Sequence, residues 1–145
     1  MSKNKPPKRA RFFIADDIRL ESSQKPMLLG FFPNDLVHIE MPENINPSDN
    51  SPVAIPGIAI LASFLGFQGS LDMKMTIIAP NDEVLIDNES LGTLEYNEVK
   101  DHAEANIVIR LSPFVIKHLG EYKLIIRILD KPYEYKFNFE KKVIK

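Results

Sequence analysis

Apolar and polar residues alternate with a period of two through the second half of the chain, the spacing of strands with one buried face. In "YEYKFNFEK" (133–141) four aromatic residues alternate with charged or amide residues, and a helix would scatter those aromatics around its whole circumference. "AEANIVIRL" (103–111) and "EYKLIIRIL" (121–129) follow the same rule. The predicted inward faces are Ala103, Ala105, Ile107, Ile109 and Leu111; Tyr122, Leu124, Ile126 and Ile128; and Tyr133, Tyr135, Phe137 and Phe139.

Shorter apolar segments in the first half follow the same rule less regularly, and turn residues bound each of them. Eleven prolines in 145 residues would break a helical bundle but are tolerated between strands. We therefore predict an all-β fold, an antiparallel β-sandwich of Ig-like or C2-like type with about eight or nine strands. A short helix or an irregular crossover is expected near residues 112–119. The earlier strands are expected in "RARFFIA", "PMLLGFF", "LVHIEM", "GIAILASFLGF", "LDMKMTIIAP" and "GTLEYNEV".

"HLGEYKLIIRI" contains a local feature of Ig-like sandwiches, because Gly120 precedes Tyr122 by two positions at the start of a strand. A tyrosine corner buries such a ring and bonds its hydroxyl to backbone a few residues upstream. The alternative is an ordinary core tyrosine after a glycine turn. The sequence leaves both interpretations open.

The length fits one domain. Residues 1–8 are expected to form a flexible basic tail, residues 9–140 a single β-sandwich domain and residues 141–145 a C-terminal tail. The basic start could neutralise phosphates, but we favour a solvated start that aids solubility. Because the net charge is only −2, neither nucleic acid nor a membrane is expected as a partner.

Several chemistries are excluded by composition. The chain has no cysteine, so it offers no disulfide, no thiolate zinc site and no cysteine nucleophile. The start lacks the apolar region of a signal peptide, and the longest apolar stretch, "VAIPGIAILASFLGF", is too short and too interrupted to span a bilayer. We expect a cytoplasmic protein.

Adjacent carboxylates, Asp16 and Asp17, are the most conspicuous candidates for catalysis or metal binding. In a strand they point to opposite faces, so they cannot flank one scissile bond unless the chain turns between them. A calcium site would need several converging aspartates, and the other candidates, Asp35, Asp82 and Asp87, fall at expected strand ends, two of them in ordinary "PND" turns. We assign no metal site. Asp16→Asn or Asp17→Asn is expected to perturb folding more than any activity.

Histidines and serines add little. His38, His102 and His118 lack the i, i+4 spacing of a helical metal site. Neither a Gly-x-Ser-x-Gly elbow nor a phosphate-binding glycine loop occurs. The sequence therefore predicts a protein that is not an enzyme, with no catalytic, cofactor-binding or metal-ligating residue and no cofactor.

Apolar residues also fall on both faces of some segments, in particular "RFFIA" and "PMLLGFF". Such a strand is covered on both sides, or it exposes a partner surface. We expect partial coverage within the monomer by the proline-rich segment 41–56. A mobile segment 41–56 would instead be a binding element.

Three stretches, "ADDIRLESSQKPMLLGFF", "APNDEVL" and "HLGEYKLIIRILDKPYEYKFNFE", resemble a group of small bacterial proteins catalogued as a domain of unknown function (DUF6941-like). The resemblance covers residues 12–32 and, more loosely, 71–140. It implies an Ig-like or C2-like sandwich in a bacterial cytoplasm and no particular activity.

Two functions of different class remain. The first is a noncatalytic protein-binding or adaptor module with an unidentified protein partner, for which a homodimer is one form. The alternative is a ligand-binding module that uses loops at one end of the sandwich, either to bind carbohydrate or to bind a ligand in a calcium-dependent way. Sugar binding normally needs exposed aromatic residues, whereas most aromatic residues here alternate inward.

Overall fold

The computed structural model describes residues 4–21, 25–95 and 104–144, and within them the fold is all-β. These residues contain no helix, and so none that is long and apolar enough to cross a membrane. The strands are β1 (Arg9–Leu20), β2 (Pro26–Phe31), β3 (Leu36–Met41), β4 (Val53–Ile55), β5 (Ile58–Leu65), β6 (Ser70–Ile78), β7 (Val84–Glu95), β8 (Glu104–Leu111), β9 (Phe114–Ile116), β10 (Gly120–Ile128) and β11 (Lys131–Val143).

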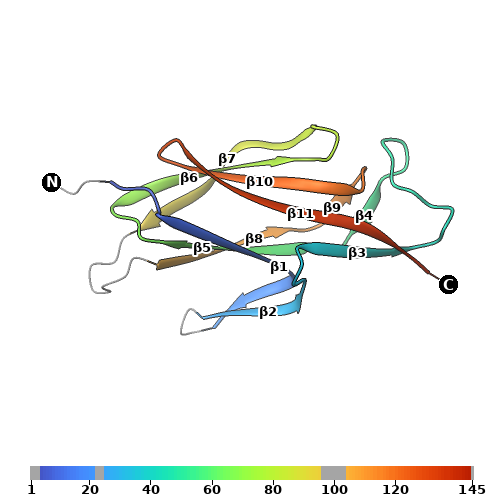
Figure 1. The fold of residues 1–145 in the computed structure, drawn as a ribbon, viewed down its shortest axis with the longest axis horizontal. Coiled ribbons are helices and arrows are strands. Elements are labelled where there is room, and N and C mark those ends of the chain that lie inside the picture. Colours follow the sequence, from blue (N-terminus) through green and yellow to red (C-terminus); the bar gives the residue numbers. More distant parts are fainter. Residues whose placement is uncertain (1–3, 22–24, 96–103, 145) are drawn as a thin grey trace.

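Two sheets form a sandwich, as predicted (Figure 1). One sheet has the order β2-β1-β5-β8, the other β3-β11-β10-β6-β7, and β4 and β9 form a small third sheet. Ig-like domains place strands A, B and E in one sheet and strands G, F, C and the added strand C′ in the other. Here β1-β5-β8 has the first arrangement and β11-β10-β6-β7 the second. The Ig-like alternative of the predicted fold class therefore describes the topology.

Three details differ from the prediction. The described residues form eleven strands rather than about eight or nine, because β4 and β9 have three residues each, too few to show a period. β9 occupies part of segment 112–119, where a short helix was considered. The sandwich is not purely antiparallel, since β3 runs parallel to β11. This parallel pair forms because the chain crosses to the second sheet after β2 and joins its edge, where the Asn138 N–H donates to the Asp35 carbonyl.

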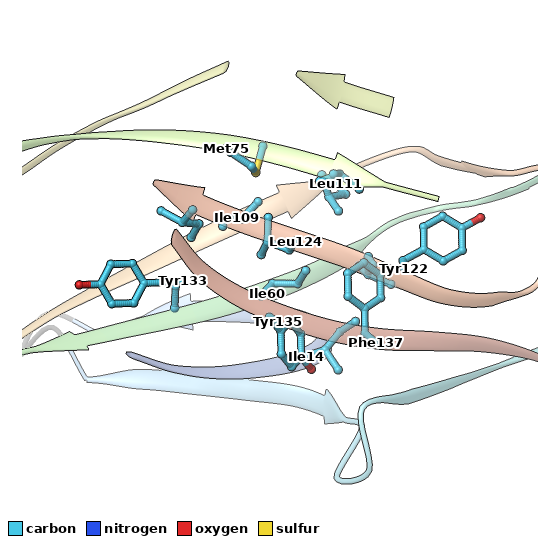
Figure 2. Close-up of a cluster of buried hydrophobic side chains, with 14 of the residues drawn as sticks. Ile14, Ile60, Met75, Ile109, Leu111, Tyr122, Leu124, Tyr133, Tyr135 and Phe137 are labelled. Atoms are coloured by element: carbon cyan, nitrogen blue, oxygen red, sulfur yellow. The ribbon is translucent and has the colours of Figure 1, made fainter. Parts of the chain in front are cut away.

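The core lies between the two sheets and contains the faces predicted from alternation (Figure 2). On β10 every inward residue is at most 1% exposed, and on β11 the four inward aromatic residues are at most 8% exposed. The β8 face is buried only at Ile109 and Leu111; Ala105 and Ile107 are half-buried, and Ala103 lies outside the described residues. The alternation therefore predicted the faces correctly, with the coverage weaker at one end of β8.

A tyrosine corner joins β9 to β10. The Tyr122 hydroxyl donates a hydrogen bond of 2.7 Å to the carbonyl of His118, four residues upstream, and the ring is 1% exposed. Gly120 allows the turn because its φ of +125° is strained for any residue with a Cβ. Burial raises the pKa of Tyr122 to about 12. This geometry confirms the corner and excludes the plain core-tyrosine interpretation.

Residues 4–8 and 141–143, which the prediction placed in terminal tails, contact the sandwich. Residues 4–8, assigned above to a flexible tail, lie beside the β5–β6 connection: Lys5 exchanges backbone hydrogen bonds with Gln68, and the Lys8 N–H donates to the Leu65 carbonyl. The Tyr133 hydroxyl donates to the Pro7 carbonyl. At the other end β11 continues to Val143, past the expected boundary at residue 140, because β3 pairs along it.

Candidate functional site

A hairpin made by the second half of β1 and by β2 is the most distinctive surface feature of the molecule. β1 pairs with β5 only as far as Ala15, which lies opposite Ala59. From Ala15 onward it pairs with β2 instead, and the hairpin extends beyond the sandwich (Figure 1). Its apolar residues therefore need a different partner from the main core.

One side of the hairpin packs on the outer face of the β1-β5-β8 sheet. Ile18 is fully buried there, and it forms a second apolar cluster, separate from the main core. This cover explains why β5 is buried on both faces. The cluster consists of Ala15, Ile18, Ala59 and Leu61, with Phe13, Leu28 and Val108 partly buried against it.

Arg110 on β8 holds the hairpin in this position. Its guanidinium donates a 2.6 Å hydrogen bond to the Ile18 carbonyl, and its Nε lies 3.8 Å from Asp17 Oδ1. The Asp17 carboxylate also accepts from the Ile18 N–H at 2.9 Å and contacts Arg19 Nε at 3.3 Å. The Asp17 carboxylate therefore contacts one backbone N–H and two guanidinium groups, and its contact with Arg110 helps to hold the hairpin on the sheet.

Asp16 has a different environment from Asp17. Its carboxylate lies against Gly30, where a Cβ would come within 2.1 Å of Oδ2, so residue 30 cannot carry a side chain without a shift. Gly30 also has a φ of +67°, which favours glycine. Asp16 and Asp17 nevertheless border the same cavity of about 430 Å³, together with Arg110 and Ser112. Strand geometry alone had placed them on opposite faces.

This cavity is a poor acid–base site. Asp17 is paired with two arginines, and the Ser112 hydroxyl donates to the Pro56 carbonyl at 2.7 Å. The remaining lining residues, Pro56, Gly57, Ile58 and Ala59, carry no titratable group. Two carboxylates with separate roles, one a proton donor and one a base or nucleophile, need environments that push their pKa values apart. The contacts favour a structural role for Asp17.

Asp17→Asn is expected to weaken hairpin docking, whereas Asp16→Asn should have little effect. Losing the charge weakens the contacts to Arg19 and Arg110. We expect the free energy of hairpin docking to fall by up to about 1 kcal/mol, since Asp17 is partly exposed. Amide hydrogen exchange of β2 and urea unfolding would measure both variants. Equal destabilisation by the two variants would contradict the assignment of docking to Asp17.

The other predicted acidic candidates do not join this pair. Asp35 lies in the β2–β3 turn with φ +56° and accepts a hydrogen bond from the Tyr135 hydroxyl. Burial, together with this contact, raises the pKa of Tyr135. Asp82 lies in the β6–β7 turn with φ +67°, and Asp87 is on β7. The two "PND" segments are therefore turns, as their composition indicated.

A different cluster forms at the end of the sandwich that holds the β6–β7 turn. Asp49, Glu83 and His118 place one ligand atom each within 4.8 Å of one another, and they are the only such group of three in the described residues. His118 Nε2 is 3.3 Å from Asp49 Oδ1, and Lys117 Nζ is 4.0 Å from Glu83 Oε1. Because each carboxylate already has a cationic or histidine partner, we interpret the cluster as an ion-pair network joining three loops. Of the other histidines, His38 is exposed on β3 and His102 lies outside the described residues.

Segment 41–56 does not cover the outer sheet face, contrary to our expectation. Its last part is β4, which pairs with β9, and Val53 and Ile55 pack at the edge of the main core. Lys141 Nζ donates to the Glu43 carbonyl and to Asn46 Oδ1. The segment is held at one end of the sandwich. The outer sheet face is covered by the hairpin instead, because the hairpin begins within β1, a strand of that sheet.

The other side of the hairpin exposes apolar residues to solvent. Met27, Leu29 and Phe31 of β2 are 42%, 38% and 46% exposed. The Phe31 ring also lies 6.2 Å from the Phe13 ring, and Gly30, with φ +67°, interrupts the extended backbone between Leu29 and Phe31. We call Met27, Leu29 and Phe31 the β2 stripe. No described strand pairs with the outer edge of β2. Sequence reasoning noted apolar residues on both faces of "PMLLGFF" but could not tell coverage from exposure; the structure shows one face covered and the other exposed.

A polar groove of about 770 Å³ lies on the outer face of β10, β6 and β7. Its walls carry side chains of both charges, including Asp72, Lys74 and Arg127. Aromatic residues do not line it, and among the described aromatic residues only Phe31 is strongly exposed. The groove therefore lacks the stacking platforms that sugar binding normally uses.

No family model matches the chain, and no curated protein matches its sequence.

Proposed function

We propose that the chain is a noncatalytic protein-binding module whose partner adds a strand to the free edge of β2. The observation that carries this proposal is the β2 stripe beside an unpaired strand edge. In strand addition, backbone hydrogen bonds supply affinity and alternate side chains supply specificity. β2 offers both, since its free backbone groups run beside three apolar side chains on one face.

The composition of β2 supports the same conclusion. Edge strands of natural proteins usually carry charges, bulges or prolines that prevent pairing. β2, "PMLLGF", has no charged residue, and its only proline is at its first position, but its backbone is irregular at Gly30, where φ is +67°. A charge-free, exposed edge strand would be an aggregation hazard unless a partner covers it.

The alternative function, binding of a sugar or calcium, has less support. Calcium takes six to eight oxygen ligands, and the one three-residue cluster in the described part of the chain includes a histidine. The polar groove lacks aromatic residues. We therefore place the function at β2.

Leu29→Lys tests this proposal, with Val84→Lys as the matched control. Both residues are exposed on edge strands, but Val84 lies on β7, at the edge of the other sheet. Affinity capture from cells that produce the protein should recover a partner with the wild type and with Val84→Lys and lose it with Leu29→Lys. Circular dichroism and thermal melting would verify that both variants fold. Recovery of the same proteins by all three chains would refute a site on β2.

A further inference from the structure

We infer that residues 4–8 occupy a peptide-binding site, and that an extended, proline-containing segment of another protein binds there when residues 4–8 are displaced. The site lies apart from β2, so the inference goes beyond the proposed function. We call it the Pro7 site, and it is formed by Gly66, Gln68, Gly69, Lys131 and Tyr133.

Two side chains of β11 bond the carbonyl of Pro7. The Tyr133 hydroxyl donates to this oxygen, and Lys131 Nζ donates to it at 3.3 Å. The Tyr133 ring is 7% exposed and is fixed edge-on against Phe64, with 5.6 Å between the ring centroids. Figure 2 shows the Tyr133 ring at one end of the cluster, with its hydroxyl pointing away from the other labelled side chains. Two donors are therefore held in place for one carbonyl of an extended segment.

Backbone groups at the end of β5 and in the β5–β6 connection bind the same segment. Lys5 and Gln68 exchange two N–H···O bonds, of 2.8 and 3.0 Å, and the Lys8 N–H donates to the Leu65 carbonyl at 2.9 Å. These bonds involve only backbone atoms of residues 5 and 8. Any segment with the same extended backbone offers them.

Two glycines let the segment lie close to this connection. Gly66 and Gly69 have φ of +74° and +93°, a conformation that favours glycine. A Cβ at Gly66 would lie 3.2 Å from Lys8 Cβ, and a Cβ at Gly69 would lie 3.2 Å from Asn4 Cα. Both positions therefore lack a side chain where the bound backbone passes.

Proline is the residue that this site favours. Among residues 4–8 only Pro7 is buried. A proline ring fixes φ and disfavours a helical conformation of the preceding residue, so Pro6-Pro7 is extended before it docks. Such a segment loses little conformational entropy on binding, and aromatic side chains commonly hold proline-rich segments in peptide recognition.

Few contacts hold residues 4–8, so a competing segment can replace them. Their release breaks the backbone bonds named above and exposes Pro7, but it breaks no pairing of β1, which begins at Arg9. Segments with few buried contacts open at a smaller free energy than the whole domain. Because residues 4–8 are joined directly to β1, they compete at an effective concentration in the millimolar range. They act as an autoinhibitory strap over the Pro7 site.

Pro7→Lys in the full chain should release residues 4–8, because it would bury a second cation beside Lys131. We expect the Gln68 amide, which donates to the Lys5 carbonyl, to exchange about tenfold faster or more, with unchanged exchange in β10. Lys5→Ala is the control, since its side chain is exposed and its backbone bonds remain. Unchanged Gln68 exchange in Pro7→Lys, or equal acceleration in β10, would show that residues 4–8 do not detach by themselves and would overturn the inference.

A capped peptide with the sequence of residues 4–8, NKPPK, tests binding from outside the chain. In calorimetric titration it should bind Pro7→Lys at least about tenfold more tightly than wild type, whose own segment competes. Adding Tyr133→Phe to Pro7→Lys should weaken binding about fivefold, because one donor to the carbonyl is lost. Leu29→Lys should leave it unchanged, which separates the Pro7 site from β2. Absence of binding to Pro7→Lys at millimolar peptide, equal affinity for wild type, or no effect of Tyr133→Phe would each refute a peptide site here.

Discussion

Phe137→Ala is expected to remove about 3 to 5 kcal/mol from the free energy of unfolding. Phe137 is fully buried and lies 5.8 Å, centroid to centroid, from each of three other rings, Tyr122, Tyr135 and Phe139. Alanine would leave a cavity between the sheets and remove these aromatic contacts. Because a domain of this size has about 5 to 15 kcal/mol of stability, the variant should be marginally folded.

Urea unfolding followed by circular dichroism would measure the loss due to Phe137→Ala as a lower midpoint. Val84→Ala is the control, since Val84 is 51% exposed and a surface substitution usually changes stability by less than about 0.5 kcal/mol. A loss below about 1 kcal/mol for Phe137→Ala would show that this part of the core is not packed as described.

Ile18→Ala is expected to release the hairpin before the sandwich unfolds. Ile18 is fully buried in the cluster on the outer sheet face, which has no members in common with the main core. Truncation of a buried isoleucine costs about 2 to 5 kcal/mol, and the loss falls on hairpin docking. We therefore expect β2 amides to exchange about 30-fold faster or more, with slower exchange retained in β10 and β11.

Leu20→Ala provides the control within the same hairpin, because Leu20 is 42% exposed. Its β2 amides should exchange at close to the wild-type rate. If Ile18→Ala accelerated β10 and β11 amides in step with β2, the hairpin would be part of the cooperative core and not a separately docked element. The result matters for function, because the docked position of the hairpin determines which side of β2 faces solvent.

Two parts of the candidate site were predictable to different degrees. The turn role of both "PND" segments follows from local rules, since turn propensity acts over a few residues. Strand geometry did not predict that Asp16 and Asp17 border one cavity, nor that Asp17 contacts Arg110 on β8. The cluster of Asp49, Glu83 and His118 had no such signal, because its members are far apart in the chain. The contact between Arg110 and Ile18, 92 residues apart, likewise leaves no periodic trace.

The sequence by itself determined the all-β fold and the inward faces of β10 and β11, and it marked Tyr122 as a candidate for a tyrosine corner, which the hydrogen bond to His118 confirmed. Each of these depends on alternation or on turn residues within one segment, and burial of one face makes that pattern strict. Only the tertiary structure decided that β3 runs parallel to β11 and that the hairpin covers the outer sheet face. Alternation shows that a face is covered but not by what, so "PMLLGFF" alone could not reveal that one side of β2 packs on the sheet while Met27, Leu29 and Phe31 remain in solvent.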